Sequence, residues 1–394
     1  MRLLKLAVCS ASLALSGLAL ADELTQNFGA TTGVQYYSNP LFSPANPQAV
    51  TVGTFNPTYS LASPGGTNSW NLNAGLNVQR SSDPNILVNR DDPTVTAGWE
   101  HDWNTSSLAL NAHYDQSSIL FGNAATVSAD NVNYIHDGSR DTSSAGAKWT
   151  DNLSDSWQLE SDASWSQILF NGLATQGGNG LANLALTNYQ VASLAMKLDK
   201  QVSATLLGYG QVTYTRLLMT GTEPNSAQVN SILGVHWQTS TALALDAYAG
   251  ESAISTDSTP GGYAASGLST PATSGWIGDA TLSWQGQRAN ASLEASRTNK
   301  PSGFGGFMST EMLSGKAGYD WSERDSSGIE YDYLKNLDLF VSTQNRYTAW
   351  AMHKFSPSIS VQLTLQRLSM AFLANPTAYE NIAGLNLIYT MASF

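Results

Sequence analysis

Strict alternation of apolar and polar side chains between Ser143 and Phe170 constrains the fold of this chain more than any other feature. One face of the second half carries Trp157, Leu159, Ala163 and Trp165, and the other carries Gln158, Glu160, Asp162, Ser164 and Ser166. A period of two residues is typical of a β-strand. The two tryptophans lie ~26 Å apart along such a strand, or roughly 20 Å along the membrane normal at a ~40° tilt. This spacing is typical of an outer-membrane barrel with two aromatic girdles, although a soluble sandwich strand also alternates.

Recurrence of this hairpin along the chain favours the barrel. Short connections follow an aromatic residue at intervals of roughly 35 to 50 residues, with one position skipped at Leu198–Gln201. The aromatic residues are Trp103, Trp149, Trp237, Trp284, Trp321 and Phe355. The intervening long connections are rich in Gly, Pro, Asn and Ser. A propeller blade recurs at ~40–45 residues, but no blade signature is present. The sequence therefore predicts an all-β, transmembrane, antiparallel up-and-down β-barrel of about 18 strands (16–18), with short periplasmic turns and long extracellular loops.

The N-terminus predicts export from the cytoplasm. Arg2 and Lys5 precede an apolar run that ends in a small-x-small cleavage site at Ala19–Ala21, so residues 1–21 are predicted to be a signal peptide. Residues 22–394 are then a single barrel domain. Cys9 is the only cysteine, and the mature chain therefore has no disulfide framework.

Composition agrees with a barrel that faces lipid. No later segment is apolar for anything near 18 residues, as a spanning helix requires. Charged residues form only 12% of the chain, whereas Trp and Tyr number 11 and 16. The net charge of −12 argues against a nucleic-acid partner. We therefore expect localisation in the outer membrane of a Gram-negative bacterium, with outer-membrane lipid and the β-barrel assembly machinery as partners.

Strand parity predicts which side chains meet lipid and which line the lumen. The expected membrane-interface aromatics are Trp103, Trp149, Trp157, Trp165, Trp237, Trp276, Trp284, Trp321 and Phe355. The expected lumenal acids are Glu100, Asp102, Asp115, Glu160, Asp162, Asp246, Asp279, Glu294, Asp320, Glu330 and Asp332, with Lys148, Arg288 and Lys316 as the expected bases. Asn71, Asn73, Asn77 and Gln79 share the lumenal face. Because acidic rings favour cations, roughly eleven acids against three bases predict a cation-preferring aqueous pore.

Phe394 resembles the terminal assembly signal of outer-membrane barrels. Counting back in twos from Phe394 gives a weak apolar series, whereas the opposite parity holds Leu385, Leu387, Tyr389 and Met391. A bulge near the end would restore a single lipid-facing side, so the facing of this strand stays open at this point.

No pattern of a catalytic, cofactor or metal site is found. None of the five histidines has a second ligand at metal-binding spacing, and no G-x-S-x-G elbow is present. Asp83, Asp91 and Asp92 are either hard-oxygen ligands for calcium or, as we expect, parts of a capped loop. The sequence predicts no catalytic residue, no cofactor and no metal.

Two segments resemble a known family: FGATTGVQYYSNP near the N-terminus and NRDDPTVTAGWEHDWNTSSLALNAHYDQSS from Asn89. With the repeated Trp-turn pattern and the terminal Phe, they resemble the outer-membrane β-barrel porin family associated with exopolysaccharide export clusters. The resemblance implies an 18-strand barrel that carries polysaccharide across the outer membrane with a periplasmic polysaccharide-export protein.

The sequence thus predicts an outer-membrane channel for hydrophilic solutes, either a diffusion pore or a polysaccharide exit, and not an enzyme. A plugged structural or adhesive barrel is the main alternative, with Leu120–Arg140 and Asn171–Leu184 as candidate plugs. An outer-membrane hydrolase is a weaker alternative.

Overall fold

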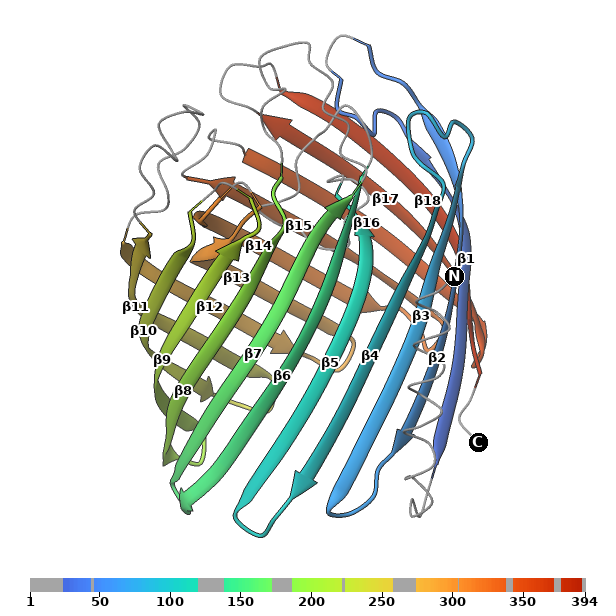
Figure 1. Ribbon diagram of the computed structural model, residues 1–394. Helices are drawn as coiled ribbons and strands as arrows, with labels where there is room; N and C mark the ends of the chain where they lie inside the picture. Colours follow the sequence, from blue (N-terminus) through green and yellow to red (C-terminus); the bar gives the residue numbers. More distant parts are fainter. Residues whose placement is uncertain are drawn as a thin grey trace.

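Antiparallel strands make up a closed ring of 18 in the computed structural model (Figure 1). The structure describes residues 24–43, 46–119, 138–171, 186–221, 224–257, 274–303, 305–337, 343–371 and 377–391. Among these residues, no helix is long and apolar enough to cross a membrane. The strands are β1 (Thr25–Tyr37), β2 (Val50–Ser63), β3 (Asn68–Ser81), β4 (Arg90–Asp102), β5 (Ser106–Ser118), β6 (Ser139–Ser154), β7 (Trp157–Asn171), β8 (Tyr189–Ser203), β9 (Leu206–Met219), β10 (Ser226–Gln238), β11 (Leu243–Thr256), β12 (Gly275–Gln285), β13 (Ala289–Pro301), β14 (Phe307–Asp320), β15 (Asp325–Asn336), β16 (Thr343–Ser356), β17 (Ile359–Ala371) and β18 (Ala378–Thr390).

Each strand pairs with its neighbours in the sequence, and β1 closes the ring against β18. The seam runs without interruption from Gly29 opposite Thr390 to Tyr37 opposite Ile382. Closure leaves no unpaired sheet edge, as a membrane-spanning sheet requires. The predicted all-β barrel and its strand number are confirmed.

Short and long connections alternate around the ring, as predicted. The short turns gather at one rim, where register shifts mark three of them: near Ser154 in β6, Ser203 in β8 and Ser356 in β16. The connection predicted at Leu198–Gln201 lies further on, between Ser203 and Leu206, because the strand continues through that bulge.

The last strand resolves the parity question. Leu385, Leu387 and Tyr389 are 38–55% exposed, whereas Ile382 and Glu380, of the opposite parity, are buried, and the register against β1 runs on without a bulge to Thr390. The predicted compensating bulge is therefore unnecessary in this range. Phe394 lies outside the described residues.

Loops fold into the barrel at the long-loop end and form a first hydrophobic cluster. Phe42, from the β1–β2 loop, and Ile86 and Leu87, from the β3–β4 loop, are at most 8% exposed. They pack against Tyr37, Val50, Val52, Leu368, Met370, Ala378 and Ile382. We call this group the β1–β4 loop cluster. Phe42 has a left-handed backbone (φ 49°), a strained geometry that burial of its ring offsets.

A second cluster forms where the β13–β14 hairpin reaches across the barrel. Phe307 is 1% exposed and packs with Ile119, Ile168, Phe170, Leu186, Tyr189 and Leu217. These residues belong to β5–β9 and adjoining loops, several strands away in the ring. Thr187 N donates to Gly303 O at 2.7 Å, and a Cβ on Gly303 would lie 2.7 Å from the Phe170 ring. We call this group the β13–β14 turn cluster. The two clusters narrow the lumen from different walls.

Candidate functional site

Burial identifies the inner face of the barrel wall. On β17, Leu368 and Met370 are each 1% exposed beneath the β1–β4 loop cluster, whereas Leu363 and Leu365 are about half exposed. The covered parity therefore points inward and the other parity points outward. Since directly paired residues share a face, the cross-strand register extends this assignment around the ring.

All the acids expected in the lumen have inward parity. On β6 and β7, for example, Glu160 pairs with Thr150, and Asp162 with Lys148. Trp149, Ala147 and Trp165 occupy the alternate, outward positions. The inward set on the strands comprises Glu100, Asp102, Asp115, Glu160, Asp162, Asp246, Asp279, Glu294, Asp320, Glu330 and Asp332. Lys148 and Lys316 share this face, whereas Arg288 lies in the β12–β13 turn.

One part of the inner wall carries a ladder of alternating charges across β6, β7 and β8. Lys148 Nζ lies 3.1 Å from Glu160 Oε1, and Lys197 Nζ lies 3.8 Å from Glu160 Oε2. Lys197 also pairs with Asp199 at 2.8 Å and lies over the Tyr209 ring at 4.9 Å. We call this the β6–β8 ladder. It neutralises its acids locally, so it adds little net charge to the lumen.

A second ladder crosses β14, β15 and β16 on the nearly opposite wall. Arg346 donates to Asp332 Oδ2 through Nε at 2.9 Å and through Nη2 at 2.7 Å. Ser314 donates to the other Asp332 oxygen at 2.7 Å. Glu330 lies 3.4 Å from Lys316 and 3.6 Å from Arg346. This β14–β16 ladder is the better buried one, with the Asp332 side chain 9% exposed.

The ladders reveal bases that the sequence reasoning missed. Lys197 and Arg346 have inward parity, as do Arg90, Arg140, Lys300 and Lys354. The estimate of three lumenal bases was therefore too low. Other predicted acids form no ion pair within the described residues: Glu100, Asp102, Asp115, Asp162, Asp279, Glu294 and Asp320.

Three further inward acids were also missed: Asp92, Asp199 of the β6–β8 ladder, and Glu380. Asp92 is discussed below with Arg90. Glu380 is fully buried beside Leu368 and has no hydrogen-bond partner within the described residues. Strand parity assigns Glu380 to the inner face, opposite Leu368. The observed strand begins at Ala378.

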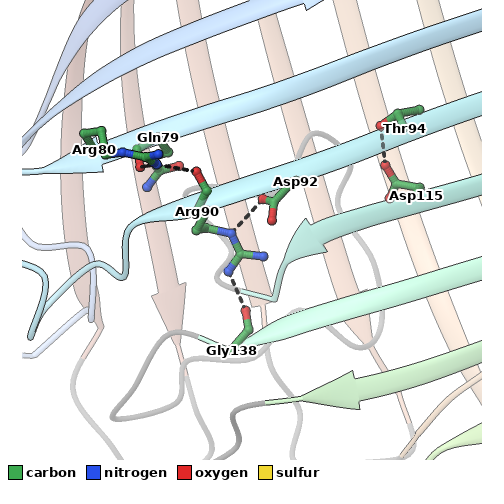
Figure 2. A network of polar contacts seen from close by, with 7 residues as sticks. All are labelled: Gln79, Arg80, Arg90, Asp92, Thr94, Asp115 and Gly138. Atoms are coloured by element: carbon green, nitrogen blue, oxygen red, sulfur yellow. Dashed lines mark hydrogen bonds and ion pairs between the residues drawn. The ribbon is translucent and has the colours of Figure 1, made fainter. Parts of the chain in front are cut away.

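The aspartates near the β3–β4 loop do not converge. Figure 2 shows Arg90 between Asp92, which accepts from Nε at 2.7 Å, and Gly138 O, which accepts from Nη1 at 2.9 Å. Asp91 has the opposite parity and pairs with Arg80 at 2.7 Å. Asp83 accepts from the backbone N of Asn85. The capped-loop interpretation therefore fits better than a calcium site, and the described residues contain no group of three metal-ligating side chains.

The histidines are dispersed and do not build a hydrolytic centre within the described residues. His101 stacks on Trp99 and meets Trp103 edge-on at the outer surface. His236 contacts Asp246 at 2.5 Å on the inner face. His353 contacts Asp325 at 2.7 Å, and Ser322 bonds the same carboxylate, so the acid, not the imidazole, occupies the middle position. A catalytic triad requires the imidazole between hydroxyl and acid. His136 lies outside the described residues.

Flat aromatic rings also line the inner wall. Trp350 has inward parity on β16, and a Cβ on Gly328 would lie 2.6 Å from its indole ring. The glycine thus lets the indole lie across the sheet. Tyr209 similarly covers Gly234, opposite Tyr248. Strand parity is the only sequence signal for these three inward rings. The predicted aromatic belt concerned outward residues and did not include them.

The expected interface aromatics are all more than a third exposed: Trp103, Trp149, Trp157, Trp165, Trp237, Trp276, Trp284, Trp321 and Phe355. Several of them form local clusters. Trp103 and Trp149 lie 5.2 Å apart between ring centroids, and Lys200 Nζ lies 4.1 Å above Trp157. The candidate plugs lie largely outside the described residues, whereas the loops seen inside the barrel are those of β1–β2, β3–β4 and β13–β14.

Comparison with solved structures shows the fold. Acinetobacter baumannii OccAB4 aligns over 95% of this chain and 99% of its own, with 12% identity and a TM-score of 0.50. Pseudomonas aeruginosa OpdO aligns over 96% and 99%, with 11% identity and a TM-score of 0.52. Another OpdO structure (OccK3) covers 95% and 97%, with 12% identity and a TM-score of 0.51. No protein-family model and no curated protein matches the sequence.

Proposed function

We propose that this chain is an outer-membrane channel that passes hydrophilic solutes and prefers cations. The observation that carries this proposal is the segregation of the wall: exposed apolar and aromatic side chains outside, ionised and amide side chains inside. An 18-strand ring is wide enough for an aqueous lumen. The fold that it shares with OccAB4 and OpdO is consistent with this role.

The expected selectivity comes from the acids that lack ion-pair partners. Glu100, Asp102 and Asp115 lie on the inner faces of β4 and β5, beside the β6–β8 ladder, and none of them has an ion-pair partner within the described residues. Carboxylates without a neighbouring cation attract mobile cations and repel anions. The paired acids of the ladders contribute less to this field.

Planar-bilayer recordings in a salt gradient test the proposal. We expect a reversal potential of the sign that cation preference gives, and a smaller one for the triple variant Glu100→Gln, Asp102→Asn, Asp115→Asn. Asp91→Asn is the matched control, since Asp91 has outward parity. Anion preference in the unmodified protein, or absence of any conductance, would contradict the proposal.

Export of a polysaccharide is a second candidate, favoured by the inner aromatic rings. Trp350 lies flat on the wall, and Glu330 and Asp320 occupy inward positions in neighbouring rows. A flat ring stacks on the apolar face of a sugar, and carboxylates accept hydrogen bonds from its hydroxyl groups. A neutral or basic polymer suits the acids better than an anionic one. Such a channel would work with a periplasmic polysaccharide-export protein.

Deletion of the gene separates the two candidates. Export predicts loss of surface polymer with unchanged uptake of small solutes, and reduced polymer with Trp350→Ala. Diffusion predicts that the deletion lowers the uptake of small solutes and leaves the surface polymer unchanged. Trp284→Ala, which changes an outward tryptophan, is the control for general damage to the barrel.

A further inference from the structure

A hollow on the outer face of β14–β18, of about 870 Å³, is not explained by transport through the lumen. Two adjacent outward rows line it. The upper row is Gly315, Tyr331, Tyr347, Arg367 and Asn381, and the lower row is Ala317, Ile329, Ala349, Leu365, Ala383 and Tyr36. The other lining residues form the inward row between these two rows. They line the hollow with their backbone atoms. The hollow therefore opens toward the membrane.

Small residues create the hollow. Gly315, Ala317, Ala349 and Ala383 leave low points in the outer surface, whereas Ile329 and Leu365 stand 64% and 51% exposed between them. A lipid-facing sheet with uniformly large side chains would have no such depression. Its lower row is apolar apart from the Tyr36 hydroxyl, which suits a hydrocarbon chain.

Arg367 stands at the upper edge of the hollow. Its guanidinium lies over the Tyr379 ring at 5.2 Å, and it has no ion-pair partner within the described residues. Tyr347 and Asn381 are its directly paired neighbours. Tyr331 and Tyr347 lie 4.8 Å apart between ring centroids. A cation on the lipid face is costly near the midplane, so its position calls for a polar or anionic partner.

Position along the strand places Arg367 near the headgroups of one leaflet. It is eight residues beyond Ile359, ~26 Å along the strand and roughly 20 Å along the normal at a ~40° tilt. The apolar band of such barrels is ~25 Å tall. Arg367 thus lies toward the long-loop rim, which faces the cell exterior in outer-membrane barrels.

Further cations lie on the same outer face, two outward rows nearer the rim than Arg367. Arg297 and Lys335 also have outward parity on β13 and β15, and they share one carboxylate, Glu311, at 3.5 Å and 4.0 Å. Within the described strands β13–β17, the outer face near this rim therefore carries three cations for one acid. Guanidinium groups bind phosphate oxygens through paired N–H donors.

We propose that this hollow is a binding site for a phosphorylated glycolipid of the outer leaflet, with one acyl chain in the hollow and a phosphate at Arg367. Tyr347, Asn381 and Tyr379 supply polar groups and rings at headgroup level, where tyrosine is commonly enriched. The inference rests on the proposed outer-membrane location but not on an open pore, because lipid binding and conductance are measured separately.

Lipid retention by the refolded full-length mature barrel tests the site. The protein is incubated in detergent with bisphosphorylated lipid A, and native mass spectrometry measures the bound lipid. We expect one retained lipid, with affinity lowered at least tenfold by Arg367→Gln and also by Ala349→Leu, which fills the hollow. Dephosphorylated lipid A should bind to the unmodified protein as weakly as bisphosphorylated lipid A binds to the Arg367→Gln variant. Phosphatidylglycerol should bind more weakly than lipid A.

Arg216→Gln is the matched control, because Arg216 is an outward cation near the same rim on β9, away from the hollow. Heat-modifiable electrophoretic mobility checks that each variant is folded. Equal lipid retention by Arg367→Gln and the unmodified protein would overturn the proposal, as would an equal loss in Arg216→Gln. A dimer that persists in place of bound lipid and is broken by Ala349→Leu would assign the hollow to a second copy of the chain instead.

Discussion

Single side chains on the inner wall differ greatly in how much they should stabilise the barrel. Asp332 accepts hydrogen bonds from Arg346 and Ser314 and is nearly buried, whereas the Lys148 side chain is 44% exposed in its pair with Glu160. Removing one partner of a buried pair leaves an uncompensated charge, which is far more costly than loss of a solvated pair.

We therefore expect Asp332→Asn to lower the free energy of unfolding by roughly 3 kcal/mol. Lys148→Gln should change it by less than about 1 kcal/mol. Urea titration in detergent micelles, followed by tryptophan fluorescence, measures both values. A similar loss of unfolding free energy in the two variants would show that the better buried β14–β16 ladder is no more stabilising than the β6–β8 ladder.

The same residues show what the sequence could and could not predict at this scale. Strand parity placed Asp332 and Glu330 on the inner face, because alternation is a property of the single strand. Arg346, which has inward parity on β16, was not among the predicted bases. Its pairing with Asp332 depends on the register between β15 and β16, which no single strand encodes.

At the scale of elements, the strands follow from sequence and the loops that enter the lumen do not. Alternating runs and short connections predicted about 18 strands, and the structure has 18, with one strand end displaced to Ser203. The β13–β14 hairpin reaches across the barrel because Phe307 is buried against Phe170, Leu186 and Leu217. That contact joins elements far apart in the sequence, so a local pattern does not reveal it.

Loosening the β13–β14 turn cluster should widen the channel. Phe307→Ala removes the buried ring at a cost of about 3 kcal/mol, which frees the hairpin end from the opposite wall. We expect larger single-channel conductance and more current noise in planar bilayers.

Phe28→Ala provides the control for this variant, because Phe28 is an outward residue, 40% exposed, on β1. It should leave conductance unchanged. Unchanged conductance in Phe307→Ala would mean that this hairpin does not limit the passage of ions.

For the whole molecule, closure of β1 on β18 is the feature on which everything else depends. Val34 and Leu385 are direct partners across the seam and both face outward. Direct partners in antiparallel strands have Cα atoms about 4.5–5.5 Å apart, within the range that a disulfide spans.

The double variant Val34→Cys, Leu385→Cys should therefore form a disulfide in the folded barrel. Oxidised protein should keep a distinct mobility on denaturing gels after heating, and reductant should abolish the difference. Val34→Cys with Leu363→Cys is the control, because Leu363 lies one strand further around the ring, about 10 Å away. Cross-linking of the control pair alone would contradict the observed closure.

The two loop clusters occupy only the long-loop end of the barrel, and this asymmetry has an electrical consequence. If the barrel conducts, an ion driven inward would pass the two clusters at the start of its path, whereas an ion driven outward would pass them last, after crossing a wall rich in carboxylates. Currents of equal driving force but opposite direction should then differ in size, so a single inserted molecule would behave as a weak diode. The same asymmetry would turn away oversized molecules at the cell surface before they could lodge within the tube.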